Sequence, residues 1–246
     1  MKKHKEKPTK IKTPRRLKKR WFVFGALGIA AIVFIIVASV SARTVGLYQL
    51  ALDNISEARF FMKHAESDTL RVQFFSGIRE QNYQMDGVAS GTVPFGLLNI
   101  DPRDGALIDT QELTGILKVG TEEINVTLER NKFGRNFATD IGKIVEDGTP
   151  IIFTLQKETD TVVFDLKPSM AEGSINWEQA LKIAVEHLAD EIRAASTFEV
   201  YVKIITDRDV TSAFWFVQFV TNDLTTHFAV INTDGSIIGN QQATPE

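Results

Sequence analysis

A run of twenty residues without a charge, 21–40, constrains this chain more than any other feature of its sequence. Seventeen of the twenty are apolar. A helix of that length spans about 30 Å, which is the thickness of the hydrocarbon core of a bilayer. The run therefore predicts a transmembrane anchor over residues 21–42. A signal peptide cleaved after Ala42 is the alternative, although the run is longer than the usual apolar region of such a peptide.

The charges on the two sides of this run predict its orientation. Residues 1–20 carry eleven Lys and Arg against one acid, Glu6, and Pro8 and Pro14 argue against a continuous helix there. Because Lys and Arg accumulate on the cytoplasmic side of a membrane, we expect a disordered cytoplasmic tail over 1–20 and an extracytoplasmic location for residues 43–246. The predicted membrane-interface residues are Lys18, Lys19, Arg20, Trp21 and Arg43.

The composition and the motifs exclude several kinds of site. The chain has no cysteine, which rules out disulfides, thiolate metal sites and cysteine nucleophiles. The histidines outside the tail are expected at the edges of helices and sheets, and the acidic segments are expected to be solvated turns. The sequence therefore predicts no catalytic residue, no metal site and no cofactor. The residues weighed for such roles are His64, His187, His227, Asp101, Asp104, Gly105, Asp109, Asp207 and Asp209.

Residues 44–168 are expected to form an extracytoplasmic α+β domain. Apolar residues from Tyr48 to Met62 recur at spacings of three and four, which predicts a helix over 44–66. Helical spacing recurs from Phe137 to Val145, and a loop rich in Gly, Pro and Asp is expected over 90–112. Alternation of apolar and polar residues predicts short strands at 70–75, 83–89, 113–119, 124–128, 151–156 and 161–166.

The last 70 residues have the clearest pattern. Asn176 and Gln179 have the spacing of a capping box at the start of a helix. Residues 198–205 alternate, and residues 213–220 are apolar on both faces, which indicates a central strand. Further strands at 225–232 and 237–238 complete an antiparallel sheet. The predicted fold class is α+β, with antiparallel sheets that are each packed with a helix.

Residues 214–219, the polar turn 221–224 and residues 227–232 and 234–239 together resemble a PepSY-type domain. The resemblance covers about residues 174–240 and implies a cystatin/PepSY-like C-terminal unit, with Asn232 where the family often has Asp. The basic tail, single anchor and such a domain are also similar to tandem PepSY-like cell-wall elongation regulators of Gram-positive bacteria. That resemblance implies a second unit within residues 67–166.

The expected function is that of a non-catalytic, single-pass membrane protein that binds partner proteins in the cell envelope and regulates cell-wall synthesis. The expected partners are the lipid bilayer and an envelope protein, and no nucleic acid. One alternative is an inner-membrane subunit of a secretion or conjugation apparatus, and another is an envelope glycan hydrolase, whose carboxylate pair would be assembled by the fold. For Trp215 and the Phe-rich strand around it, a buried core and a ligand-lining surface both remain open.

Overall fold

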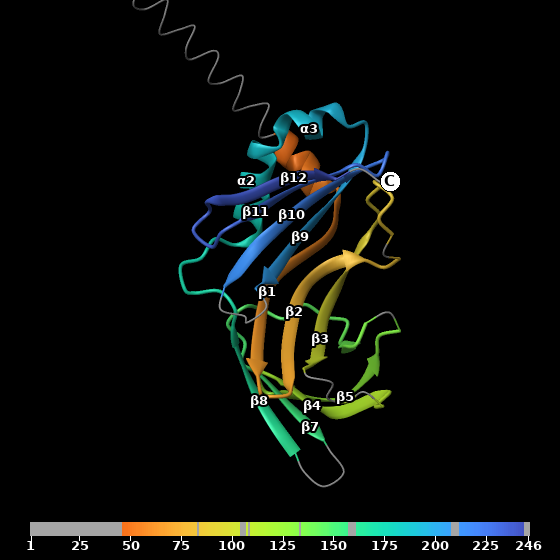
Figure 1. Ribbon diagram of the computed structural model, residues 1–246, viewed down its shortest axis with the longest axis vertical. Helices are drawn as coiled ribbons and strands as arrows, with labels where there is room; N and C mark the ends of the chain where they lie inside the picture. The colour runs from red at the N-terminus through yellow and green to blue at the C-terminus, as the bar shows by residue number, and fades with distance from the viewer. Residues whose placement is uncertain are drawn as a thin grey trace, which may run out of the picture. The chain divides into compact units, whose positions relative to one another are not determined.

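The computed structural model describes residues 46–246 except 83, 104–106, 108, 133, 157–160, 208–211 and 244–246. Residues 46–53 are helical, and the strands that follow join one sheet in the order β12-β11-β10-β9-β1-β2-β3-β6-β5-β4-β7-β8 (Figure 1). The elements are β1 (Ile55–Glu66), β2 (Leu70–Glu80), β3 (Thr92–Pro102), β4 (Glu112–Val119), β5 (Glu122–Arg130), β6 (Phe137–Asp140), β7 (Ile151–Gln156), β8 (Thr161–Pro168), α2 (Trp177–His187), α3 (Ala189–Ala194), β9 (Phe198–Thr206), β10 (Ala213–Thr221), β11 (Thr226–Ile231) and β12 (Ile237–Ala243).

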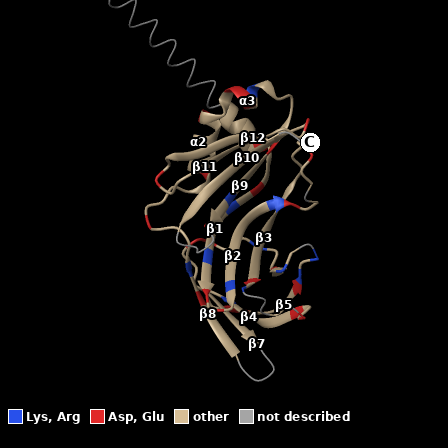
Figure 2. Ribbon diagram, viewed as in Figure 1, with Lys and Arg blue, Asp and Glu red and all other residues tan. Residues whose placement is uncertain are grey.

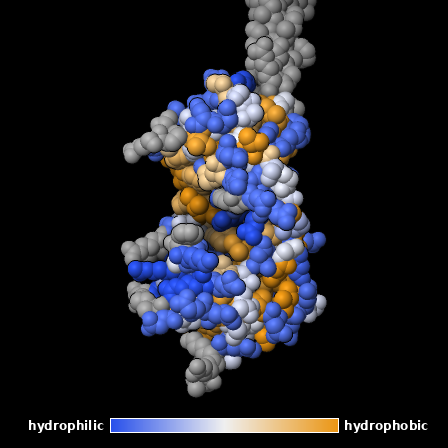
Figure 3. Space-filling model, turned by 90° about the vertical axis from the view of Figure 1, so that its right-hand side faces the viewer, coloured by the Kyte–Doolittle hydropathy of each residue, from blue (hydrophilic) through white to orange (hydrophobic). Residues whose placement is uncertain are grey.

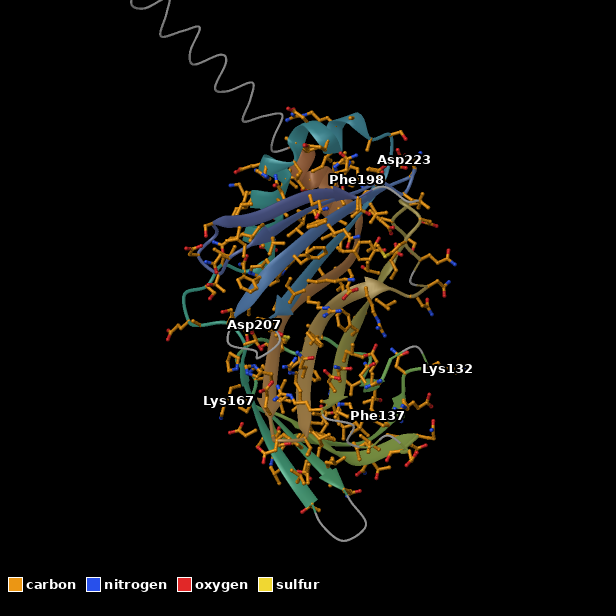
Figure 4. The ribbon with its side chains drawn as sticks, in the orientation of Figure 1. Lys132, Phe137, Lys167, Phe198, Asp207 and Asp223 are labelled. Carbon is orange, nitrogen blue, oxygen red and sulfur yellow. The ribbon has the colours of Figure 1, made fainter. Side chains whose placement is uncertain are left out.

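Strands β1 to β8 form a closed barrel. Each strand pairs antiparallel with its neighbours, and β8 returns to β1, where Lys63 lies opposite Pro168 and His64 opposite Lys167. Alternate side chains of these strands point inward and fill the interior, including Phe74, Leu98 and Phe137. Figure 4 labels Phe137 in this part of the molecule. The strands supply most of this first core, and Val145 from the connection between β6 and β7 completes it.

Strands β9 to β12 form an antiparallel extension of the same sheet. β9 runs parallel to the start of β1, with Ile55 opposite Val200 and Ala58 opposite Val202. Helices α2 and α3 and the helical residues 46–53 pack on one face of this extension. Val185 of α2 and Val217 of β10 are both fully buried in this second core.

A β-bulge in β1 connects the two cores. The register between β1 and β2 shifts between Arg59 and Phe61, which leaves Phe60 as the extra residue. Phe61 points into the barrel core, while Phe60 packs against both cores. The ring of Phe60 stacks on that of Trp177 at the start of α2, with the ring centroids 5.3 Å apart. Strand β1 therefore contributes side chains to both hydrophobic cores.

The predicted fold class is wrong, and with it the description as cystatin/PepSY-like. The error arises because two segments that were predicted as helices are strands. Residues 55–66 form the long strand β1 instead of continuing a helix, and residues 137–140 form β6. The barrel is therefore closed by strands and has no helix of its own in the described part of the chain, so the fold is mainly β. Residues 92–102 form β3 where a loop was expected.

The single-pass membrane localisation is also corrected. Within the described residues, no helix has both the length and the apolar character that are needed to cross a bilayer. The predicted anchor at 21–42, the tail at 1–20 and the interface residues Lys18, Lys19, Arg20, Trp21 and Arg43 lie outside the described residues. The predicted division into domains at 44–168 and 174–240 stays a prediction, although the pairing of β1 with β9 joins strands of both ranges.

Several local predictions are confirmed. Helix α2 begins with the capping box, in which the Asn176 side chain accepts from the Gln179 backbone N–H and the Gln179 side chain accepts from that of Asn176, both at 2.9 Å. Strands occur at five of the six positions predicted by alternation before residue 168. Residues 84–89 are the exception and contain no strand.

Candidate functional site

Strand β10 divides its side chains between two environments. Trp215, Val217 and Phe219 point toward α2 and are at most 1% exposed. Phe214 and Phe216 alternate with them and point to the opposite face of the sheet, where both are only partly buried. The buried-core interpretation of the Phe-rich strand is therefore confirmed for the face that carries Trp215. The ligand-lining interpretation stays a prediction for the face that carries Phe214 and Phe216.

The neighbouring strands extend this second face. In the sheet register, Phe214 lies opposite Ile205 of β9, and Phe216 lies opposite Val230 of β11. Phe228 stands diagonally across from Phe216, and their ring centroids are 5.1 Å apart. We call these five residues the open face: Ile205, Phe214, Phe216, Phe228 and Val230. None of the five belongs to either hydrophobic core.

The open face is apolar and in contact with solvent. Ile205 is 38% exposed, and the other four residues are partly exposed. Viewed from the right of Figure 1, the molecule shows apolar surface above a hollow about halfway down (Figure 3). Adjacent apolar side chains left in water on a sheet face are typical of a surface that binds another protein.

An ionic cluster borders the open face on the side of β1. Lys203, which lies opposite Phe216, places its Nζ 3.2 Å from Glu57 Oε2, and Arg59 Nε lies 2.7 Å from Glu57 Oε1. Burial alone would raise the pKa of the Glu57 carboxyl, but Arg59 and Lys203 outweigh it and hold that pKa below its ordinary value. Figure 2 shows charged residues on β1 and β9, whereas β10 to β12 carry none.

Two buried carboxylates lie beyond this cluster. Ser56 Oγ is 3.0 Å from Glu80 Oε1 and 3.0 Å from Glu199 Oε2, and the two Glu residues are at most 2% exposed. A carboxylate pair is the arrangement that a glycan hydrolase would need. Here, however, the pair is enclosed within the protein.

The segment between β2 and β3 encloses these carboxylates. The backbone N–H of Gly87 donates to Glu199 at 3.0 Å, and that of Ser90 donates to Glu80. The Tyr201 hydroxyl adds a bond of 2.9 Å to Glu199. The carboxylate oxygens therefore hold the segment between β2 and β3 against β9, and their role in the described structure is a structural one.

A cavity of about 400 Å³ lies where the two cores meet. Its apolar wall includes Phe60, Met62, Met170 and Trp215, and the exposed Glu172 stands among its lining residues. The indole N–H of Trp215 donates to the carbonyl of Ile175 at 3.0 Å, which fixes the segment 168–176 against the sheet. Polar residues also line the cavity, among them Asp147, Ser174 and Asn176, so its wall is mixed in character.

The histidines weighed from the sequence lie apart from one another. His64 Nδ1 is 2.8 Å from Ser169 Oγ, and burial lowers the pKa of this imidazole. His187 Nε2 is 2.7 Å from the side-chain nitrogen of Asn240, and His227 lies in β11 opposite Phe219. Each histidine therefore lies on a helix or a strand of the described fold, and the structure brings no two of them together.

The acidic segments weighed from the sequence form no metal centre among the described residues, where no group of three His, Asp or Glu side chains could hold an ion. Asp101 lies in β3 opposite Arg71. Asp207, which follows β9, accepts from the backbone N–H of Ser212. Asp104, Gly105 and Asp209 lie outside the described residues.

Sequence reasoning did not find the open face as a set. Phe228 and Val230 lie on β11 and Ile205 on β9, so their association with Phe216 depends on the strand register. The signal that was available is the run of apolar residues on both faces of residues 213–220. A second covered face was expected there. The structure covers it at Val220, which is 2% exposed, and leaves it partly open at Phe214 and Phe216.

Comparison with known proteins gives this chain no relative. No protein family, no curated protein and no solved structure matches it, and the resemblance of residues 174–240 to a PepSY-type domain has no support from these comparisons.

Proposed function

We propose that this chain is a non-catalytic binding protein and that the open face is the surface that binds a partner protein. The observation that carries the proposal is the contact between Phe216 and Phe228 on a sheet face opposite the helices. Burying aromatic residues of this kind supplies much of the binding energy of protein interfaces.

The surroundings of the open face fit a protein partner. The ionic cluster of Glu57, Arg59 and Lys203 borders the apolar residues, and interfaces commonly have an apolar centre and a polar rim. The expected partner therefore presents an apolar patch to Phe216 and Phe228, with polar groups at its margin. The enclosed carboxylate pair favours binding over glycan hydrolysis as the role of this part of the molecule.

Photo-crosslinking in cells tests this proposal. A photoreactive phenylalanine analogue is placed at Phe216 or at Phe228 in the full chain, and a third variant carries it at Val163, which is 63% exposed on β8. We expect the variants at 216 and 228 to crosslink the same protein and the variant at 163 not to crosslink it. Identical products from all three positions, or none from 216 and 228, would reject the open face as the binding surface.

A further inference from the structure

Strand β12 is one end of the sheet and has an open edge. It pairs with β11 from Thr226 opposite Ala243 to Ile231 opposite Ile237, and no other described strand pairs with it. In an antiparallel ladder every second residue directs its N–H and C=O away from the neighbouring strand. The outer side of β12 therefore carries a row of backbone donors and acceptors that another strand can use.

The chemistry of this edge favours pairing. Its sequence, Ile-Ile-Gly-Asn-Gln-Gln-Ala, has no charge and no proline, and six of its seven residues are exposed. The edge of β5 that faces β6 differs. β5 pairs with β6 only at Glu129 and Arg130, and the part of this edge that has no partner strand among the described residues begins with Glu122 and Glu123. Natural proteins use charged residues on sheet edges to prevent those edges from associating with other chains. Such charges are present on β5 and absent from β12, whose one irregularity is a register shift at Ile238 near its start.

We propose that β12 pairs antiparallel with β12 of a second copy of this chain about a two-fold axis. All seven residues overlap only when the axis passes through Asn240. Ile237 then faces the partner subunit's Ala243, Ile238 faces the partner subunit's Gln242, and the two Asn240 side chains meet at the centre.

In this register the edge of β12 is complementary to the same edge of a second copy. Every opposed pair is uncharged, and amide side chains are donors and acceptors at once, so they can bond to their own kind. The strand is thus complementary to itself, as a two-fold interface requires. It has no charged group with which to select a particular foreign segment. A pair of seven-residue strands is small for an interface, so we expect a reversible dimer.

The dimer is independent of the proposed function because it uses the edge of the sheet and leaves its open face uncovered. A two-fold axis perpendicular to the sheet places the open faces of both copies on the same side. Loss of the dimer would therefore leave binding by one open face intact, and the two proposals fail separately.

Disulfide trapping tests the register, since the chain has no cysteine of its own. Opposed Cα atoms in an antiparallel pair are about 4.5–5.5 Å apart, within the range of a disulfide. We expect the full chain with Asn240→Cys to form a covalent dimer under mild oxidation. Gln242→Cys is the matched control, because its side chain is also exposed but its counterpart is displaced by about 14 Å along the strands. Equal trapping at both positions, or none at 240, would overturn the proposal.

Charge substitution at the same position gives a second measurement. Asn240→Lys and Asn240→Asp should each abolish the dimer in sedimentation experiments, and an equal mixture of the two should restore it. Asn240→Ala controls for loss of the contact with His187 and should keep the dimer. A full chain that is monomeric at every concentration, or whose dimer survives Asn240→Lys, would contradict pairing through β12.

Discussion

The rings of Phe216 on β10 and Phe228 on β11 lie 5.1 Å apart, centroid to centroid, on the sheet face opposite α2. The residues next to Phe216 in sequence, Trp215 and Val217, point the other way and are buried in the core. One strand thus contributes alternately to stability and to an accessible apolar surface. The proposed function depends on this division, and the following predictions test it together with the structure around it.

The two faces of β10 should differ in their contribution to stability. Trp215→Ala removes a side chain that is 1% exposed and a hydrogen bond to Ile175, and we expect a loss of about 3–5 kcal/mol in the free energy of unfolding. Phe216→Ala removes a partly exposed ring and should cost less than about 2 kcal/mol. Urea unfolding of both variants measures the difference. Equal losses would show that the open face is buried.

The ionic cluster should make stability dependent on pH in the acid range. The pKa of Glu57 is lower in the folded chain than in the unfolded chain. The contribution of Glu57 to stability is therefore complete above the unfolded pKa of 4.5 and is lost as the pH falls through the folded pKa. We expect Glu57→Gln to cost about 3 kcal/mol at pH 7, because it removes the buried negative charge that Arg59 and Lys203 contact.

The same variant supplies the pH test. The difference in unfolding free energy between the native chain and Glu57→Gln should shrink steadily as the pH falls below about 4.5. Unfolding curves at several pH values measure that difference. A difference that stays constant down to the most acidic value would contradict the role assigned to Arg59 and Lys203.

His64 should titrate below the ordinary histidine range. Burial lowers the pKa of its imidazole, Glu66 raises it and Arg71 lowers it further. The neutral ring is thus favoured in the folded chain, and its contribution to stability is complete above pH 6.5 and declines as the pH falls through the lowered value. An NMR titration, with His64→Gln to assign the signal, measures this pKa. A value at or above 6.5 would disagree with a half-buried ring.

Gly77 should be intolerant of a side chain. A Cβ atom at this position would lie 1.9 Å from the carbonyl oxygen of Ala58, beside the bulge in β1. We expect Gly77→Ala to destabilise the chain by about 1–3 kcal/mol because β1 must move away from β2. Gly91→Ala is the control, since nothing lies within 4 Å of its added Cβ, and it should change stability by less than about 0.5 kcal/mol. Similar effects of the two substitutions would contradict the close approach of β1 to Gly77.

The sequence predicted those elements whose signal is local. The capping box at Asn176 depends on two residues three apart, and the hairpin of β4 and β5 depends on alternation within 18 residues. Such patterns can be recognised without knowledge of the fold. The strands from β7 to β11 were found for the same reason.

The fold class was predicted wrongly mainly because the sequence of β1 has the spacing of a helix. The spacing of Ile55, Ala58 and Met62 is that of a helix, yet these residues lie on one strand that has buried side chains on both faces and a bulge. Burial on both sides removes the polar alternation that normally indicates a strand. The closure of the barrel and the open face depend on pairing between distant strands, which a single sequence does not specify.

Co-purification of the partner with variants of the open face tests the central claim most directly. The full chain, tagged at Glu246, is compared with Phe228→Ser and with Val163→Ser, which changes an exposed apolar residue on the barrel. We predict that Phe228→Ser reduces recovery of the protein crosslinked from position 216 at least tenfold and leaves the folded state intact, while Val163→Ser recovers it fully. Undiminished recovery with Phe228→Ser would show that the open face is not the binding surface.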